Sequence, residues 1–381
     1  MAVQNRILLV SWTVPPIKSG SVFIIEQFIK FFSKEELVIL GESTHNHSHE
    51  NIHYVASNPI QLKKGNRFIS WYRWLLIPRI TKEIISVYQA KKCTLILCVF
   101  PDEIYLEAAR RAAKKLKAPF YPYFHNTYLE NRSGFSRFMA RRIQPKVFHQ
   151  AKKAYVMSEG LVKWYQPLYP NISFQALVHP FVMQKAGGYK GLAFNDAILT
   201  ITYLGNLNES NIDAFRFFVE CISEMDKVEL KIISSTPAWF YEKLSLLKKN
   251  VRILSSVSDE GLMKELQNSH LLFLPHGFNG GLSELEYQTI FPTRTIQYLF
   301  SGVPILGLFP DKTFLCEFLR EHQCAEIITV KNQSTIAARI NYLKNNPLFC
   351  QTLVNNALKT SDLFLAQNVL ENLKKEIFSP R

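Results

Sequence analysis

Short apolar runs, often of β-branched residues, alternate with longer amphipathic stretches through the first half of the chain. The runs predict buried strands at 7–11, 37–40, 95–100 and 120–124. The stretches at 22–32 and 103–115 have the length and spacing of helices. This alternation is typical of parallel βαβ units.

The same alternation starts again in the second half, after a glycine-rich stretch at 183–195 that predicts a linker. The first new strand is predicted at 198–204. The next stretch, 211–222, predicts a helix, with four apolar residues at helical spacing: Ile212, Phe215, Val219 and Ile222. Further strands are predicted at 230–233, 251–254, 271–274 and 305–308. The pattern therefore predicts an α/β fold with two doubly wound domains in tandem.

We expect the first domain to span 1–182 and the second 196–360. A chain of 381 residues exceeds what one hydrophobic core usually organises, which favours two domains. The remaining segment, 361–381, has helical periodicity and suits a helix that packs back on the first domain, although the sequence alone does not locate it. Parallel sheets bind ligands at the carboxyl ends of their strands, so two such sheets facing each other predict a cleft with a site on each lip.

Composition narrows the class of protein. Apolar residues make up 47% of the chain and charged residues 20%, as in a globular protein. The six cysteines are scattered without metal-ligand spacing, which suits reduced core residues of a cytoplasmic protein. Pro15 and Pro16 follow the first apolar run, so we interpret it as a strand and not a signal peptide. No run reaches the length of about 18 apolar residues that a spanning helix needs.

The positive charge is concentrated in one half. Residues 1–185 contain 26 Lys and Arg against 11 Asp and Glu, a net charge of +15, whereas 186–381 contain 19 against 20. Such asymmetry indicates an anionic partner, either lipid headgroups or nucleic acid, unless it serves only solubility. No nucleic-acid recognition motif is present, so we expect no nucleic acid as partner.

Two segments rich in basic and aromatic residues, 63–79 and 132–153, are candidates for contact with a membrane surface. In the first, Phe68, Trp71, Trp74 and Leu75 recur at helical spacing among basic residues. In the second, Phe135, Phe138 and Met139 lie beside Arg137, Arg141 and Arg142. The alternative to membrane contact is that these aromatic stripes face the core of the protein. We expect peripheral attachment to the anionic inner face of the cytoplasmic membrane.

The stretch VPPIKSGS at 14–21 leaves the first strand and enters the first helix. Ser21 is expected to cap that helix, and Gly20 would let a ligand approach the backbone closely. The stretch lacks the G-x-G-x-x-G pattern of dinucleotide binders, which argues against a dehydrogenase.

The stretch FPTRTIQYLFSGVPIL at 291–306 is the most specific in the chain. Pro292 suits a first helical turn and Gly302 a helix end. The free N–H groups at the start of such a helix attract a phosphate, and Arg294 would add a full charge. Gln297, one turn further, would reach a ribose hydroxyl. The alternative is a well-capped helix with a purely structural role.

This stretch resembles the donor-site motif of bacterial glycosyltransferases of the retaining GT-B group, family 4 and relatives, whose helix commonly reads F-P-[ST]-[KR]-x-x-E-Y-L-A-x-G-x-P-I. Other parts of the chain match in order: the Pro-Pro-x-x-x-Gly loop, His125 in YPYFHNTY, His179-Pro180, and YLGNLNESN. The resemblance implies the GT-B architecture, in which two Rossmann-like domains face each other across a cleft.

The resemblance also implies roles for particular residues. His125 and Arg294 would be catalytic, His125 by contacting the transferred sugar, although a strand-end histidine with local partners is the alternative. Ser19 and Ser21 would bind the acceptor. The donor would be bound by Gly20, Gly205, Asn206, Phe291, Pro292, Thr293 and Gln297.

The function implied is transfer of a sugar from a UDP- or GDP-linked donor to a glycan or lipid-linked acceptor in bacterial surface polysaccharide synthesis, with retention of configuration. No cofactor is expected, and no metal, because no Asp-x-Asp motif occurs. Two departures stand out: Thr289 and Gln297 replace the family's usual pair of Glu, and the turn at Gly205 lacks the usual Arg and Lys. The alternative is therefore a degenerate GT-B domain that binds a glycan or a partner without turnover.

Overall fold

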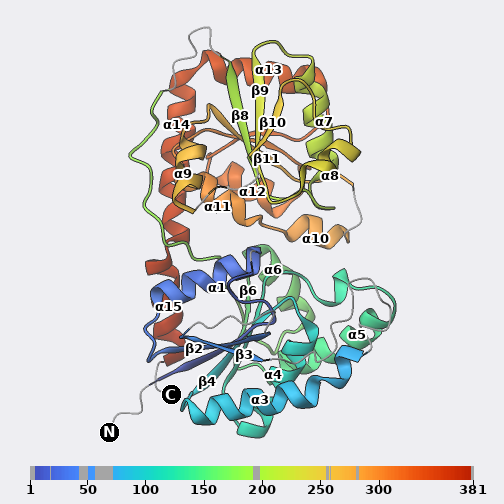
Figure 1. Ribbon diagram of the computed structural model, residues 1–381, viewed down its shortest axis with the longest axis vertical. Helices are drawn as coiled ribbons and strands as arrows, with labels where there is room; N and C mark the ends of the chain where they lie inside the picture. Colours follow the sequence, from blue (N-terminus) through green and yellow to red (C-terminus); the bar gives the residue numbers. More distant parts are fainter. Residues whose placement is uncertain are drawn as a thin grey trace. The chain divides into compact units, whose positions relative to one another are not determined.

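The computed structural model describes residues 5–17, 19–42, 50–55, 72–191, 198–254, 257, 259–279 and 283–378. The chain divides into two compact units (Figure 1). Unit 1 comprises Met1–Val182 and Leu365–Arg381, and unit 2 comprises Met183–Phe364.

Unit 1 is built on a parallel sheet of seven described strands in the order β3-β2-β1-β4-β5-β6-β7. The strands are β1 (Ile7–Val10), β2 (Leu37–Glu42), β3 (Ile52–Val55), β4 (Leu95–Phe100), β5 (Phe120–Phe124), β6 (Ala154–Val156) and β7 (Phe174–Ala176). Residue Ile7 is in register with Leu37 on one side and Leu95 on the other. The central strands β1, β4 and β5 are buried along their whole length, which explains their unbroken apolar sequences.

The helices of unit 1 include α1 (Gly20–Phe31), α3 (Ile77–Ala90), α4 (Glu103–Leu116), the 3₁₀ turn η1 (Leu129–Asn131), α5 (Gly134–Gln150), α6 (Glu159–Leu168) and α15 (Ala366–Phe378). Helix α4 packs against both α3 and α5, so the three form one layer. Asp102 caps α4 by accepting hydrogen bonds from the N–H groups of Ile104 and Tyr105.

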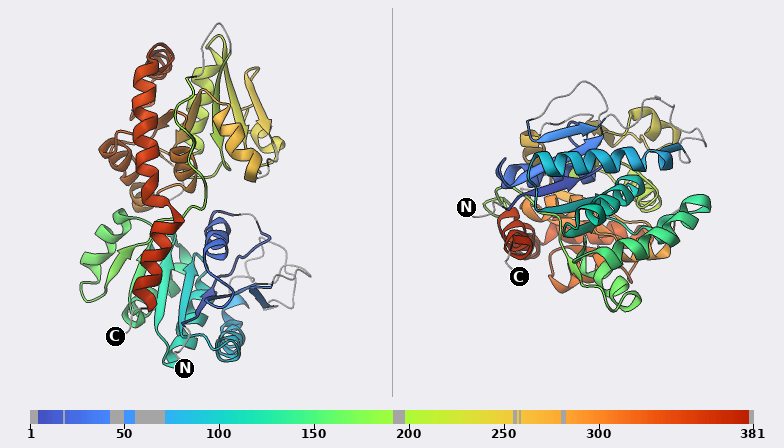
Figure 2. Two further views of the ribbon diagram at one scale, coloured as in Figure 1. Left: turned by 90° about the vertical axis from the view of Figure 1, so that its left-hand side faces the viewer. Right: turned by 90° about the horizontal axis from the view of Figure 1, so that it is seen from below.

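The C-terminal helix α15 belongs to unit 1. It packs against α1, and its side chains Leu370, Leu373 and Ile377 are buried in the same core as β1 and β4. The chain returns to this unit at a bridge between Phe181 and Leu365. Figure 2 shows the two stretches of red helix, α14 and α15, in a second view.

Unit 2 repeats the design with a parallel sheet of six described strands in the order β10-β9-β8-β11-β12-β13. The strands are β8 (Leu199–Leu204), β9 (Val228–Ile233), β10 (Val251–Leu254), β11 (Leu271–Pro275), β12 (Ile305–Leu308) and β13 (Glu326–Ile328). Its described helices are α7 (Ile212–Ser223), α8 (Ala238–Lys243), α9 (Asp259–Gln267), α10 (Glu284–Thr289), α11 (Thr293–Phe300), α12 (Phe314–Glu321), α13 (Gln333–Asn345), α14 (Pro347–Thr360) and the 3₁₀ turn η2 (Ser361–Phe364).

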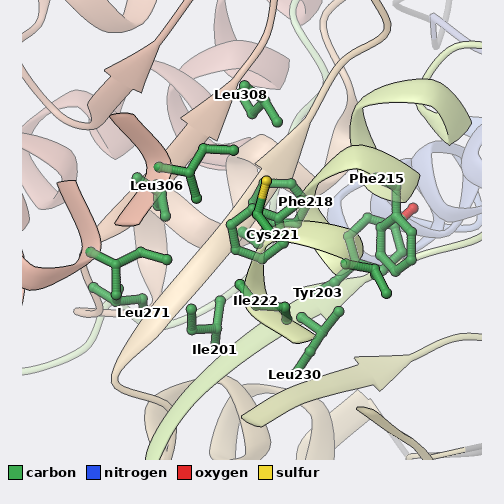
Figure 3. Close-up of a cluster of buried hydrophobic side chains, with 14 of the residues drawn as sticks. Ile201, Tyr203, Phe215, Phe218, Cys221, Ile222, Leu230, Leu271, Leu306 and Leu308 are labelled. Carbon is green, nitrogen blue, oxygen red and sulfur yellow. The ribbon is translucent and has the colours of Figure 1, made fainter. Parts of the chain in front are cut away.

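In the core of unit 2, buried side chains of α7, α13 and α14 pack with those of the sheet; Figure 3 shows the part around α7. Phe218 of α7 stacks on Phe273 of β11 with ring centroids 3.7 Å apart. Tyr203 of β8 lies beside Phe215, 4.7 Å between centroids, and is fully buried. The packing of α7 therefore holds the end of β8 in place, and the candidate site begins there.

Two local expectations are corrected. Ser19, and not Ser21, caps α1: its hydroxyl accepts a hydrogen bond from the Val22 N–H, and the helix already begins at Gly20. Pro292 is the N-cap of α11 and not part of its first turn, because its ψ of 132° is extended. The expected stop at Gly302 is confirmed, since Gly302 has a φ of +74° just after the helix. Of the basic segment 63–79, residues 63–71 lie outside the described residues.

Candidate functional site

A glycine turn follows β8 in unit 2. Gly205 has a φ of +112°, a backbone conformation that residues with a Cβ atom rarely adopt. Its N–H donates a hydrogen bond to the Ile233 carbonyl oxygen at 2.8 Å. A Cβ atom placed on Gly205 would lie 3.2 Å from the guanidinium carbon of Arg294. The turn and the arginine, 89 positions apart in the chain, are therefore in direct contact.

Tyr203 holds the Arg294 side chain in this position. The guanidinium lies over the Tyr203 ring, 4.9 Å from its centroid, and Nη1 donates a hydrogen bond to the Tyr203 hydroxyl. The same hydroxyl donates to the Asn206 carbonyl oxygen at 3.0 Å. Burial raises the pKa of Tyr203, so the hydroxyl stays protonated and keeps this donor role. A cation is thus fixed beside the glycine turn.

Tyr298 positions the helix that carries Arg294. Its hydroxyl accepts a hydrogen bond from the Leu204 N–H at 2.8 Å and donates one to the Phe273 carbonyl oxygen at 3.1 Å. These two bonds join α11 to the end of β8 and to the middle of β11. The start of α11 is thereby held at the carboxyl edge of the sheet, where parallel sheets bind ligands.

Asn206 has a structural role within the turn. Its side-chain oxygen accepts hydrogen bonds from the hydroxyls of Ser234, Ser235 and Thr236, at 3.0, 2.9 and 3.2 Å. The Ser235 N–H donates to the same oxygen at 3.1 Å. The oxygen is therefore used to join the glycine turn to the loop after β9.

The other residues expected to bind the donor surround the start of α11. The Phe291 ring is buried, stacks on Phe364 at 5.5 Å and meets Phe318 edge-on at 5.0 Å. Its side chain thus anchors the chain before the helix. Thr293 and Gln297 are partly exposed, on the first and second turns of α11.

Thr289, the first of the two residues that replace the family's usual pair of Glu, has a structural role. The Thr289 hydroxyl donates to the Leu285 carbonyl oxygen at 2.8 Å, within α10. Nearby, the buried His276 places its two ring nitrogens 3.1 and 2.8 Å from the carbonyl oxygens of Ser210 and Tyr287. His276 therefore joins α10 to the loop after β8.

A second cluster lies in unit 1, at the start of α1. The Ser21 hydroxyl and His125 Nδ1 are 3.2 Å apart, and His125 is buried at the end of β5. The His125 ring meets the rings of Tyr123 and His179 edge-on, with centroids 4.4 and 4.8 Å apart. Burial, together with His179, holds the pKa of His125 well below its usual value. Burial lowers the pKa of His179 to about 4. Both imidazoles are neutral at pH 7.

Solved structures resemble the whole chain closely in fold. The UDP complex of HepE from Anabaena is 11% identical, with a TM-score of 0.71 over 98% of this chain and 99% of that one. Sucrose-phosphate synthase from Thermosynechococcus elongatus is 9% identical, with a TM-score of 0.68 over 98% and 99%. The lipopolysaccharide outer core galactosyltransferase WaaB is 15% identical, with a TM-score of 0.65 over 98% and 99%. The chain has the GT-B fold.

No protein-family model matches the sequence, and no curated protein matches it significantly. The similarity to these solved structures is therefore one of fold, at sequence identities of 9–15%. Within the GT-B fold, the residues expected to form sites separate into two groups. Gly205, Asn206 and Arg294 are brought together in unit 2, whereas Ser19, Gly20, Ser21 and His125 are gathered in unit 1.

Sequence reasoning missed the tyrosines and hydroxyls that organise the candidate site in unit 2. Tyr203 and Tyr298 are buried, and sequence patterns treat buried tyrosines as core residues. The one available signal is the position of Tyr203, two residues before the glycine of the turn. Across the described residues, no three His, Cys, Asp or Glu side chains gather as a metal site requires.

Proposed function

We propose that the chain is a glycosyltransferase that uses a nucleotide-diphosphate sugar, UDP- or GDP-linked, as donor. The observation that carries the proposal is the Arg294 guanidinium held by Tyr203 against the Gly205 turn. A fixed cation beside a close-approach glycine and a helix start is suited to a diphosphate. HepE, which shares the fold, has been solved in complex with UDP and with UDP-glucose.

The acceptor that we propose is a glycan or a lipid-linked glycan, in bacterial surface polysaccharide synthesis at the inner face of the cytoplasmic membrane. Support comes from the fold shared with WaaB, a lipopolysaccharide outer core galactosyltransferase, and from the charge of residues 1–185. None of the helices in the described ranges is both long and apolar enough to cross a bilayer.

The proposed reaction retains configuration and needs no metal. The acceptor oxygen bonds to the anomeric carbon as the bond to the diphosphate breaks on the same face, and the acceptor proton passes to the leaving diphosphate. Negative charge develops on that diphosphate, where Arg294 and the free N–H groups of α11 would stabilise it electrostatically. Neutral His125 would hydrogen-bond a sugar hydroxyl without adding a charge.

Calorimetry with UDP, GDP and the corresponding nucleosides tests the donor site. Arg294→Ala should weaken binding of the preferred diphosphate about 10- to 150-fold, because charge-assisted hydrogen bonds contribute about 1.5–3 kcal/mol. Binding of the nucleoside should change little. Arg320→Ala, which removes an exposed arginine of the same unit paired with Asp311, is the control. Equal losses for diphosphate and nucleoside would remove Arg294 from the phosphate site.

A binding protein derived from a GT-B enzyme is the second candidate. It is favoured by one observation: Thr289 bonds within its own helix where the family pattern has a carboxylate. NMR of purified protein with UDP-glucose separates the two candidates. An enzyme would slowly transfer the sugar to water or to an acceptor. The first product would have the same anomeric configuration as the donor. The reaction would continue in the presence of EDTA, because no metal is needed. Binding without any turnover would support the second candidate.

A further inference from the structure

Helix α5 begins with a stretch that extends beyond the core of unit 1. None of the residues 134–139 is buried, and the first buried side chain of the helix is Ala140. Phe135 and Phe138 are each 48% exposed, with rings stacked 6.3 Å apart. Exposed apolar patches, especially those rimmed by polar residues, mark sites of protein or membrane interaction. In Figure 1, α5 lies at the margin of its unit.

The same stretch is strongly basic. Helix α5 contains no acidic residue, and its basic residues Arg137, Arg141, Arg142 and Lys146 are exposed. None of these four forms an ion pair with another described residue. The Arg142 guanidinium lies 4.1 Å from the centroid of the Phe138 ring. Cations without acidic partners beside exposed aromatic rings make a surface that suits an anionic, partly apolar partner.

Two ion pairs connect the start of α5 to the start of α3. Arg132, just before α5, pairs with Glu103 at 2.9 Å, and Arg73, just before α3, pairs with Asp102 at 2.6 Å. The two carboxylates are adjacent at the start of α4, which packs between the other two helices. Leu75, two residues after Arg73, is 58% exposed. Exposed apolar side chains therefore occur on both sides of α4, at one end of the α3–α4–α5 layer.

We propose that this end of unit 1, comprising Leu75, Phe135, Phe138, Arg137, Arg141 and Arg142, docks on the headgroup region of an anionic lipid bilayer. The apolar side chains enter the boundary of the acyl chains, and the guanidiniums stay among the phosphates. The inference rests on the proposed function in one respect, the lipid-linked acceptor. Docking here would bring the membrane that contains this acceptor to the carboxyl edge of the sheet, where α3, α4 and α5 begin.

The geometry favours lipid over nucleic acid. Single-stranded nucleic acid is usually bound in a groove with open aromatic faces on which bases stack. Here the aromatic rings lie on a projecting helix end, and the guanidinium of Arg142 lies over the ring of Phe138. An apolar tip surrounded by cations matches a headgroup layer better.

Co-sedimentation of the full-length protein with vesicles tests the proposal. The vesicles are phosphatidylcholine alone or with added phosphatidylglycerol, across a sodium chloride series. Wild type should bind the anionic vesicles, less so as salt rises. Removing three charges with Arg137→Gln, Arg141→Gln and Arg142→Gln should weaken binding roughly a hundredfold, at about fivefold per charge. Phe135→Ser with Phe138→Ser should weaken binding at every salt concentration.

Matched controls come from the same unit. Lys114→Gln, Lys115→Gln and Lys117→Gln remove three exposed charges at the opposite end of α4, and Trp164→Ser with Leu168→Ser removes an exposed apolar pair on α6. Both controls should bind vesicles nearly as wild type does. Circular dichroism establishes that each variant is folded. Equal loss in test and control variants would overturn the proposal, as would tight binding of single-stranded RNA that the three Arg→Gln changes abolish without altering vesicle binding. Calorimetry with UDP on the same variants tests the proposed function separately: UDP binding without vesicle binding would overturn only the docking proposal.

Discussion

At the scale of single residues, the contact between Gly205 and Arg294 depends on the missing Cβ. Gly205→Ala should strain a backbone at φ +112° and displace the guanidinium, which a Cβ would approach to 3.2 Å. We expect a loss of about 1–3 kcal/mol in the free energy of unfolding and weaker UDP binding. Urea unfolding and calorimetry measure the two effects. Gly187→Ala is the control, because nothing lies within 4 Å of its Cβ position; equal effects of both changes would contradict the role given to Gly205.

The two buried histidines of unit 1 predict a dependence of stability on pH. In the folded state the pKa of His179 is about 4 and that of His125 is well below its usual value, whereas an unfolded histidine titrates near 6.5. The unfolded chain therefore binds more protons between these values, and stability falls as the pH drops from about 6.5 to about 4. The effect of His179 alone is on the order of 3 kcal/mol.

Unfolding of wild type and His179→Gln by urea, at several pH values between 4 and 7, measures this effect. The variant should lose less stability on acidification than wild type does. His53→Gln, which changes an exposed histidine of β3, should behave as wild type. Parallel pH profiles for wild type and His179→Gln would show that His179 titrates normally in the folded protein.

At the scale of elements, one hydroxyl, that of Tyr298, links α11 to two strands of the sheet. Tyr298→Phe should leave the Leu204 N–H and the Phe273 carbonyl oxygen without this partner, at a cost of about 1–3 kcal/mol. Diphosphate binding should weaken too, because Arg294 is carried by the same helix. Chemical denaturation and UDP titration report both. The control is Tyr342→Phe, at a tyrosine 42% exposed in the same unit; if it matched Tyr298→Phe, the hydroxyl would not be what positions α11.

Among the elements, strands with mostly apolar sequences could be predicted best. Strands β4, β5, β10 and β12 have the predicted bounds. The strand β3 was not predicted, nor were β6, β7 and β13, which have only three residues each. A strand that short has too few positions to show a pattern, and pairing with a neighbour stabilises it instead.

At the scale of the whole molecule, unit 1 is completed by the last helix of the chain. Leu370→Ala should lower the stability of unit 1 by about 2–5 kcal/mol, since Leu370 is fully buried in the core with α1. Hydrogen exchange followed by proteolysis should show faster exchange in α1 and β1 and unchanged exchange in unit 2. Gln367→Ala, on the exposed side of the same helix, is the control. Faster exchange confined to unit 2 would contradict this assignment.

The sequence by itself determined what neighbouring residues decide: the buried strands from their unbroken apolar runs, the end of α11 at Gly302, and the concentration of positive charge in residues 1–185. Only the tertiary structure decided which side chains meet. Tyr203 and Arg294 are 91 positions apart, and the loop at 234–236 reaches Asn206 from the next strand. Such contacts follow from the order of the strands in the sheet, which places distant segments side by side at its carboxyl edge, and no local pattern records that order.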